Sequence, residues 1–487
     1  MCDETPNSFI GIGGESSFLR RATVRVELLV VAWDGVSPDT IAKLMGEGTL
    51  PVLRDLLGGF SVRSIRSTVP PVTANAWTSF HLGVNPGKHG ILDFLHRHPG
   101  MPPRVVSSRD FPYPTFWEVL AEDLPVGVVG FPLGYPPRPL ARGFWVPGFL
   151  APKGAASFPP EALAIARREG YAFNPPMWFP GKRWVEDLKR NVRAKTAASL
   201  ALAQRYKPLL LGIHYQETDT VQHFLWGSSE MEELFAAADA ELGVLLEGLS
   251  PRAVLLLSDH GMGPLRWDFH LNTWLLREGL LILRRSPFTR LRRRLFDLGL
   301  CPRTFQGIGE RVASFLGNLF RLPSLEALWH RADFGTRVFL SYRDVDWERS
   351  TVYPFGAMGT LSLNRGAEKA VDRLLERLLE LRAPDGERAV EKVFTRTELY
   401  WGERVHLLPD LFFLTRRMEI LPVSSSLFLY HRPFSSPSVP GNHRMEGFLA
   451  TNAALEVYEN MPIWEIASAI LAYFNKPAPG YMDVPSP

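Results

Sequence analysis

Residues 253–261 read Ala-Val-Leu-Leu-Leu-Ser-Asp-His-Gly, an apolar run that ends in a carboxylate, an imidazole and a glycine. A short, continuous apolar run is typical of a buried strand in a parallel sheet. In α/β sheets, ligand-binding side chains gather at the carboxyl ends of the strands, which is where Asp259 and His260 stand. Because both residue types are metal ligands, the stretch indicates half of a metal site, although alone it also fits an ordinary turn.

Similar apolar runs recur along the chain and alternate with helical stretches. Strands are predicted at residues 26–33, 60–67, 126–131, 208–213, 253–258 and 410–415, and helices at 38–44, 116–122, 192–204 and 230–249. This alternation predicts an α/β fold with a mostly parallel central sheet and helices on both faces. We expect an N-terminal extension over 1–25, one large domain over 26–475 with cap insertions at about 147–189 and 283–334, and a C-terminal tail over 476–487.

The composition is that of a folded protein that binds no nucleic-acid polymer. Of the 487 residues, 46% are hydrophobic, and the formal net charge is only +3, which gives no general field for polyanions. Two cysteines, Cys2 and Cys301, do not suggest a disulfide framework. Neither a signal peptide nor an apolar run of about twenty residues is visible, so we expect a cytoplasmic protein without a transmembrane segment. The oligomeric state is left open.

An arginine-rich segment, residues 284–298, lies inside the second predicted insertion. Its arginines are spaced with Leu291, Leu295, Phe296 and Leu298, which predicts a basic amphipathic helix. A solvated helix face on a cap is the favoured interpretation of such a charge run. Contact with a membrane surface is the alternative.

Three further fragments carry side chains that bind metals. Asp34 directly follows the first predicted strand, and His443 lies in a loop rich in proline and serine. Asp219 and His223 are four residues apart, which places them on one face of a helix. Each fragment also has a purely structural interpretation, as a turn or as a pair of side chains on a helix surface. Together with Asp259 and His260, these nitrogen and oxygen donors suit a pair of divalent ions, Zn²⁺ first and Mn²⁺ as the alternative.

The segment from Pro70 to Gly90 resembles the nucleophile region of the alkaline phosphatase superfamily, in its type I phosphodiesterase/nucleotide pyrophosphatase branch. In that branch a threonine opens a helix and a Pro-x-x-His-Gly turn follows. Thr73, sixteen positions before His89, matches the threonine, with Thr78 and Ser79 as rivals. Without that resemblance, Thr73 also fits a simple helix N-cap.

The resemblance implies an alkaline-phosphatase-like fold and a ligand set. One ion would be held by Asp219, His223 and His443, and the other by Asp34, Thr73, Asp259 and His260. The activity implied is hydrolysis of small-molecule phosphate esters, diesters foremost, by in-line attack of Thr73 through a phosphothreonine. The alternatives are a phosphomonoesterase or phosphotransferase on the same site, and an inactive binding protein that retains the fold.

Substrate contacts are predicted less directly. The branch has an asparagine three positions after the nucleophile, where this chain has Ala76, and Asn75 is the nearest substitute. His89, His214 and Asn272 also lie near the motifs in sequence. For His89 and His214, a hydrogen-bonded structural role is the favoured interpretation.

Overall fold

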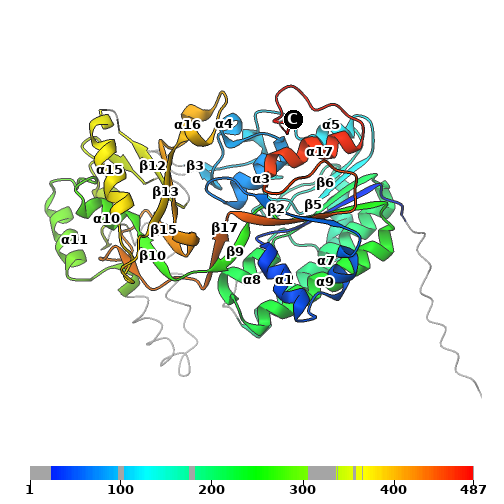
Figure 1. Ribbon diagram of the computed structural model, residues 1–487, viewed down its shortest axis with the longest axis horizontal. Helices are drawn as coiled ribbons and strands as arrows, with labels where there is room; N and C mark the ends of the chain where they lie inside the picture. The colour runs from blue at the N-terminus through cyan, green and yellow to red at the C-terminus, as the bar shows by residue number, and fades with distance from the viewer. Residues whose placement is uncertain are drawn as a thin grey trace, which may run out of the picture.

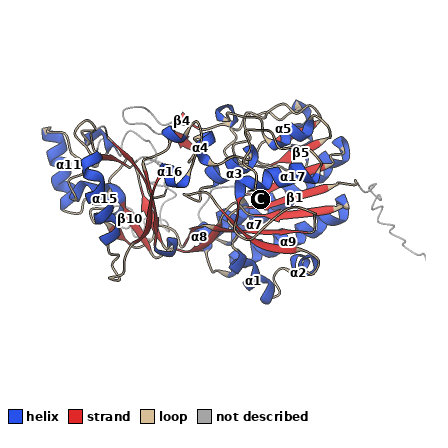
Figure 2. Ribbon diagram, turned by 45° about the horizontal axis from the view of Figure 1, so that its top comes forward, coloured by secondary structure: helices blue, strands red, loops and turns tan. Residues whose placement is uncertain are grey.

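The computed structural model describes residues 24–96, 104–174, 181–304, 336, 338–354, 358–364 and 366–485. Two lobes lie side by side, one around an eight-stranded sheet and the other around two smaller sheets (Figure 1, Figure 2). The predicted N-terminal extension lies outside the described residues except for Val24 and Arg25.

The large sheet has the strand order β19-β2-β18-β8-β1-β7-β5-β6, and only β18 runs against the others. Its strands are β1 (Leu28–Trp33), β2 (Ser61–Arg66), β5 (Val126–Val129), β6 (Gly143–Val146), β7 (Leu210–Tyr215), β8 (Ala253–Leu257), β18 (Glu446–Thr451) and β19 (Met461–Pro462). The predicted mostly parallel α/β sheet is confirmed. Its centre, β7-β1-β8, consists of three fully buried apolar strands.

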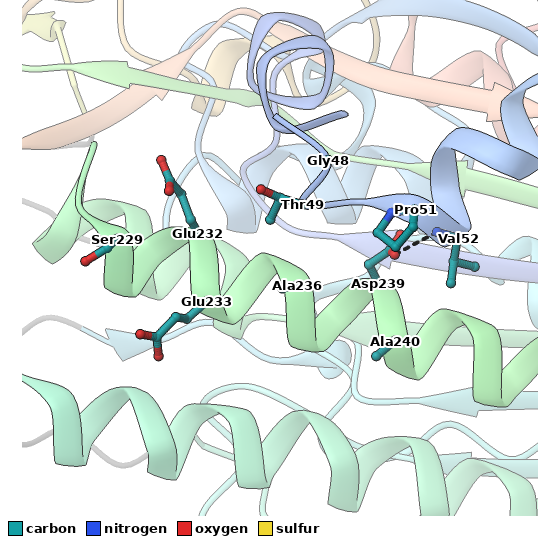
Figure 3. A pocket seen from close by; sticks show the side chains of 10 residues that line it. All are labelled: Gly48, Thr49, Pro51, Val52, Ser229, Glu232, Glu233, Ala236, Asp239 and Ala240. Carbon is teal, nitrogen blue, oxygen red and sulfur yellow. Dashed lines mark hydrogen bonds between the residues drawn. The ribbon is translucent and has the colours of Figure 1, made fainter. Parts of the chain in front are cut away.

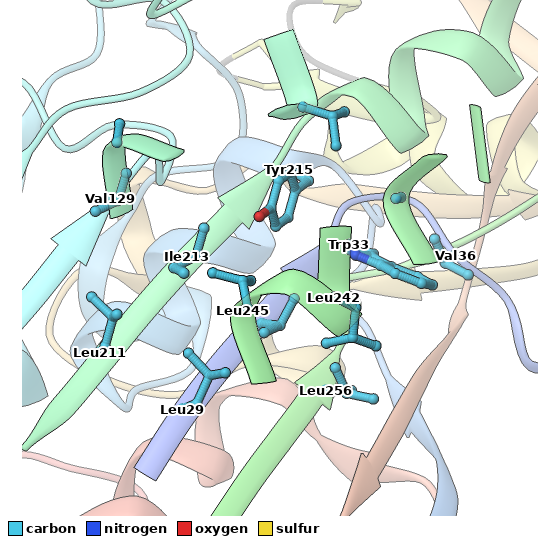
Figure 4. Close-up of a cluster of buried hydrophobic side chains, with 14 of the residues drawn as sticks. Leu29, Trp33, Val36, Val129, Leu211, Ile213, Tyr215, Leu242, Leu245 and Leu256 are labelled. Carbon is cyan, nitrogen blue, oxygen red and sulfur yellow. The ribbon is translucent and has the colours of Figure 1, made fainter. Parts of the chain in front are cut away.

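Alternate residues of β1 face two separate cores, as the period of a strand requires. Leu29, Val31 and Trp33 pack into one core, which helices from one side of the sheet complete (Figure 4). Leu28 and Val30 pack into the other core, with helices from the opposite side. The first side carries α1 (Pro38–Gly46), α2 (Pro51–Leu57), α6 (Pro160–Arg168), α7 (Lys182–Tyr206) and α9 (Ser229–Leu249); the second carries α3 (Thr73–Leu82), α5 (Phe116–Ala121) and α17 (Ile466–Tyr473).

The smaller lobe, here called the cap lobe, has its own hydrophobic core. A three-stranded sheet, β15-β10-β16, and a four-stranded sheet, β11-β12-β14-β13, form its described part together with the helices α10, α11 and α15. These elements are β10 (Trp267–His270), β11 (Val352–Tyr353), β12 (Thr360–Leu363), β13 (Val390–Thr395), β14 (Leu411–Thr415), β15 (Ile420–Val423), β16 (Phe434–Ser435), α10 (Leu271–Arg277), α11 (Pro287–Asp297) and α15 (Glu368–Glu380).

Short elements join the two lobes and line the edge of the large sheet. A two-stranded ribbon, β9 with β17, lies between the lobes (Figure 1). The bounds of the remaining elements are β3 (Leu95–His96), β4 (Arg104–Val105), α4 (Pro86–His89), α8 (Glu217–Leu225), β9 (Gly261–Pro264), α16 (Arg396–Leu399), β17 (Gly441–Arg444), and the 3₁₀ turns Ser108–Asp110, Tyr342–Asp344, Val405–Leu407, Arg416–Met418 and Ile463–Glu465.

Each predicted strand and helix forms, with differences at its bounds and in its place. The strand predicted at 410–415 becomes β14 of the cap lobe, and the helix predicted at 192–204 begins already at Lys182. The first predicted insertion, 147–189, carries α6 and the beginning of α7, and Ala162 and Ala166 of α6 lie in the core of the large lobe. Most of the second, 283–334, lies outside the described residues, so the insertion boundaries stay a prediction. Among the described helices, none is long and apolar enough to cross a membrane.

A surface pocket of about 560 Å³ lies where α2 meets α9 (Figure 3). Asp239 of α9 stands at its inner end and accepts hydrogen bonds from the backbone N–H groups of Val52 at 2.9 Å and Leu53 at 2.8 Å. These N–H groups belong to the first turn of α2, whose own N-cap residue, Leu50, provides no side-chain acceptor. Asp239 therefore caps α2 from a neighbouring helix.

Replacing Asp239 with alanine is expected to lower the free energy of unfolding by about 1–2 kcal/mol, because two N–H groups lose their acceptor. Urea unfolding followed by circular dichroism measures this change. Asp239→Asn keeps one acceptor oxygen and serves as the matched control, with a smaller loss. Equal stability of the alanine variant and the native protein would contradict the capping role.

Candidate metal centre

Metal-ligating side chains from four segments meet at the carboxyl edge of the large sheet. Asp34 follows β1 and Asp259 follows β8, and these strands are direct neighbours. Asp219 lies in the first turn of α8, just after β7, which pairs with the other side of β1. Parallel neighbours end at one edge, so the three carboxylates converge, as the sequence predicted.

The late histidine reaches the same place through the β9-β17 ribbon. β9 begins at Gly261, directly after His260, and β17 pairs with it so that His443 stands opposite Met262. The rings of His260 and His443 stack with their centroids 3.8 Å apart. Residues 259–261 therefore supply ligand types, and they also begin β9, the strand against which β17 brings His443 into the site.

The first group of candidate ligands is Asp219, His223 and His443. The Oδ1 atom of Asp219 lies 3.3 Å from Nε2 of His223 and 3.4 Å from Nε2 of His443, and the two Nε2 atoms are 2.9 Å apart. Two ligand atoms of a tetrahedral zinc ion, each at about 2.0–2.1 Å, lie roughly 3.3 Å from one another. The spacing of this group fits such an ion.

The second group is Asp34, Asp219 and His260, with Asp259 and Thr73 beside it. Nε2 of His260 lies 3.6 Å from Oδ1 of Asp34, 3.3 Å from Oδ2 of Asp259 and 3.2 Å from Oγ1 of Thr73. Asp219 belongs to both groups, so the two candidate positions adjoin.

Each of the three carboxylates has one oxygen bound by the protein and one without a partner. Oδ2 of Asp34 accepts hydrogen bonds from Nε1 of Trp77 at 2.9 Å and faces Nε2 of His214 at 2.7 Å. Gly35 N–H donates to Oδ1 of Asp259, and the Gln216 amide donates to Oδ2 of Asp219. The other oxygens, Asp34 Oδ1, Asp219 Oδ1 and Asp259 Oδ2, are buried and have no hydrogen-bond partner. Buried, unpaired carboxylate oxygens of this kind fit bound cations.

The three histidines are oriented by main-chain carbonyls. Nδ1 of His223 faces Gly441 O at 3.1 Å, Nδ1 of His443 faces Pro71 O at 2.7 Å, and Nδ1 of His260 faces Gly261 O at 3.0 Å. A carbonyl accepts only from an N–H at Nδ1, so in the neutral imidazole it is Nε2 that carries the lone pair and is directed into the site. This outer contact is usual for histidines that ligate metals.

In the metal-free protein, burial and mutual repulsion oppose ionisation of two of the carboxylates. Burial, followed by the charge of Asp219, raises the pKa of Asp34, and burial with Asp34 and Asp219 raises the pKa of Asp259. Burial also pushes the pKa of Asp219 upward, but His223 and His443 outweigh it and hold that pKa well below its ordinary value. Bound cations would offset the burial and the mutual repulsion that oppose ionisation of Asp34 and Asp259.

Thr73 is the first residue of α3 and is buried beside the second group. Of the three candidate nucleophiles, only Thr73 contacts a candidate ligand, through His260. Thr78 donates its hydroxyl to Ala74 O, and Ser79 pairs with Nε2 of His89.

The three residues predicted to contact the substrate, Asn75, His89 and Asn272, make their hydrogen bonds outside the two ligand groups. His89 is buried between Ser79 and the N–H of Ile91, and burial lowers its pKa to about 3. The side-chain amide of Asn272 donates to Ser425 O in the cap lobe, while Asn75 turns its amide toward Pro70 O. These contacts do not reach the two ligand groups, so substrate binding by the three residues stays a prediction.

Three further residues orient the carboxylates: Trp77, His214 and Gln216. Trp77 and Gln216 are not among the candidate site residues that the sequence predicted. His214 was interpreted as a structural histidine, and its contact with Asp34 depends on two strands that are distant in sequence. The only local signal was that His214 and Gln216 follow a predicted strand.

Comparison with known proteins shows which family and which folds this chain is similar to. The family model for type I phosphodiesterase/nucleotide pyrophosphatase matches residues 28–299. Phosphonoacetate hydrolase from Sinorhizobium meliloti 1021, solved with phosphonoformate, has a similar fold with a TM-score of 0.57 at 16% identity, covering 92% of this chain and 96% of that one. An inactive variant of murine ectonucleotide pyrophosphatase/phosphodiesterase 5, solved with AMP, has a TM-score of 0.50 at 13% identity, covering 94% and 96%. No curated protein matches the sequence.

The family match, together with the fold, identifies a phosphoric ester hydrolase of the alkaline phosphatase superfamily. Within that superfamily, the chain belongs to the type I phosphodiesterase/nucleotide pyrophosphatase family, because the family model covers more than half of its length.

Divalent metal is expected to raise the thermal-unfolding midpoint more at high pH than at low pH. A carboxyl whose folded pKa is raised stabilises the metal-free fold below its unfolded pKa of about 3.9, and that stability is lost as the pH rises through the folded value. Asp34 and Asp259 are such groups. Metal ions bind their ionised forms, so the stability that the metal-free protein loses with rising pH is restored by the metal.

Thermal scans with Zn²⁺ or with EDTA, from about pH 5 to about pH 8, measure this gain. In Asp34→Asn with Asp259→Asn, the gain should depend less on pH. A gain in the native protein that shrinks as the pH rises would contradict the linkage.

Proposed function

We propose that this protein hydrolyses phosphodiesters with Thr73 as the nucleophile and two divalent ions, Zn²⁺ first and Mn²⁺ as the alternative. The observation that carries the proposal is the position of the Thr73 hydroxyl, 3.2 Å from Nε2 of His260 and beside carboxylate oxygens without partners. Asp219, His223 and His443 would hold one ion, and Asp34, Asp259, His260 and Thr73 the other.

When bound, such ions lower the pKa of a coordinated hydroxyl and neutralise charge on a phosphoryl group. The protein contributes the positions of the reacting groups. Thr73 opens α3, so the N–H groups of the first helical turn lack intrahelical acceptors and are available to phosphate oxygens. Positioning and charge neutralisation supply most of the catalysis in phosphoryl transfer, so no separate general base is required.

The reaction is proposed to run in two displacements. In the first, Oγ1 of Thr73 forms a bond to phosphorus while the bond to the leaving alcohol breaks, and that alcohol departs with a proton. The product is a phosphothreonine ester. In the second, water attacks phosphorus, the bond to Oγ1 breaks, and a phosphomonoester is released with Thr73 restored.

The ligands of the similar structures support the substrate class. The phosphonoacetate hydrolase was solved with phosphonoformate and with phosphonoacetate, and the murine protein with AMP. All three are small molecules that carry a phosphorus oxoanion.

The charges around the site favour a diester over a monoester. A monoester carries one more negative charge and calls for a further cation at the phosphate. Among the described residues, no lysine or arginine pairs with Asp34, Asp219 or Asp259. Arg444, next to His443, directs its guanidinium to main-chain carbonyls, including those of Met418 and Asn442.

Thr73→Ala is expected to lower kcat for bis-p-nitrophenyl phosphate by at least about a thousandfold, because the covalent intermediate cannot form. Thr73→Ser keeps the hydroxyl and should retain measurable turnover with a trapped phosphoserine in acid-quenched samples. Thr78→Val removes a neighbouring hydroxyl of the same helix and is the matched control. Native-like activity of Thr73→Ala would exclude Thr73 as the nucleophile.

Bis-p-nitrophenyl phosphate is expected to have a kcat/KM at least about tenfold above that of p-nitrophenyl phosphate for the Zn²⁺-loaded protein. The reason is the lack of an additional cation for the monoester dianion. Both rates are followed by release of nitrophenolate under identical conditions. Equal or higher kcat/KM for the monoester would favour the phosphomonoesterase alternative, and no turnover of either would favour the binding protein.

A further inference from the structure

Helix α11 is fixed to the cap lobe by one face. Thr289 donates its hydroxyl to Oδ1 of Asp344 at 2.8 Å, and Arg292 binds the same buried carboxylate through Nε at 3.1 Å. One turn further, Phe296 is buried and packs edge-to-face on Phe428, with ring centroids 5.8 Å apart. The helix therefore has a fixed orientation about its own axis.

That orientation leaves an apolar strip in solvent. Phe288, Leu291 and Leu298 are 72%, 56% and 78% exposed. Their spacing of three and seven residues places them along one side of the helix. Such exposed large apolar side chains, grouped rather than scattered, mark an interaction surface. The strip lies at the outer end of the cap lobe, remote from α7 and α9 (Figure 1, Figure 2).

Unpaired positive charge accompanies the strip. Arg285, Arg290 and Arg294 are exposed, and no carboxylate pairs with them in the part of the chain that the structure describes. Arg292 and Arg293 differ, because they pair with Asp344 and Asp297. The free charge therefore sits on the arginines that border the strip, and it is complementary to an anionic surface.

We propose that α11 docks this protein on the anionic face of a lipid bilayer. The apolar strip would enter the interfacial region of the bilayer, and Arg285, Arg290 and Arg294 would contact lipid phosphates. An interfacial amphipathic helix binds a membrane in this way, with its apolar face buried and its basic residues at the headgroups. A partner protein would have to present an apolar groove whose shape fits the strip. A lipid bilayer requires no such fit, because exposed apolar side chains beside unpaired basic ones are sufficient for binding to it. This docking does not depend on the catalytic proposal.

Flotation of the full-length protein with vesicles tests the docking. Binding is expected to vesicles of phosphatidylcholine with about a third phosphatidylserine, and at least about tenfold less to phosphatidylcholine alone. Arg290→Glu with Arg294→Glu should lower binding at least tenfold, and so should Phe288→Ser with Leu298→Ser. High salt should weaken binding of the native protein.

Matched controls change equally exposed residues elsewhere: Arg168→Glu with Arg388→Glu for charge, and Val105→Ser with Val484→Ser for the apolar strip. Thermal unfolding of every variant shows that each is folded. Failure to bind anionic vesicles at low salt would overturn the proposal, as would equal binding to neutral vesicles. Loss of binding in the controls, or dimerisation that only the Phe288 and Leu298 variant abolishes, would also overturn it.

Discussion

Three buried carboxylates at one sheet edge constrain the rest of this structure. Asp34 and Asp259 are fully buried and Asp219 is nearly so, and each leaves one oxygen without a protein partner. Burying such groups is costly unless opposite charge or hydrogen bonds compensate it. The backbone at Gly35 lies so close to Asp219 that a Cβ on residue 35 would be only 2.9 Å from Oδ1 of Asp219. Gly35 also has a φ of +72°, which is in the left-handed region. Only glycine accommodates both the close contact and the positive φ.

The connection between the lobes follows from the same constraint. β9 starts where the carboxylate-bearing loop ends, and β17 returns from the cap lobe to pair with it. His443 thus arrives at the carboxylates by main-chain pairing, although more than 180 residues separate it from His260. Gly261 permits this route, because a Cβ there would clash with the carbonyl oxygen of Glu446. The cap lobe is therefore tied to the centre through the backbone that carries a candidate ligand.

The sequence predicted the parts of this arrangement that are local. Continuous apolar runs predicted β1, β7 and β8, and the polar residues at their ends are those that converge. The strand pattern at residues 410–415 did not predict that β14 belongs to the cap lobe, because such a pattern does not show which sheet a strand joins. The first ten residues of α7, 182–191, were not predicted as helix, because they directly follow a segment rich in proline and aromatic residues that shows no helical period. The role of Trp77 and His214 depends on packing between distant segments, whereas Asn272 lies near a motif in sequence but bonds within the cap lobe.

Most of the contacts that orient the candidate ligands are made by the main chain. His223, His260 and His443 each direct Nδ1 at a backbone carbonyl, and Asp259 accepts a bond from the N–H of Gly35. A backbone group is present whatever side chain it bears, so these contacts persist as long as the chain follows the same path. Asp34 and Asp219 are the exceptions, because the side chains of Trp77 and His214 hold the first and the side chain of Gln216 holds the second, so their orientation depends on which residues stand at those three positions.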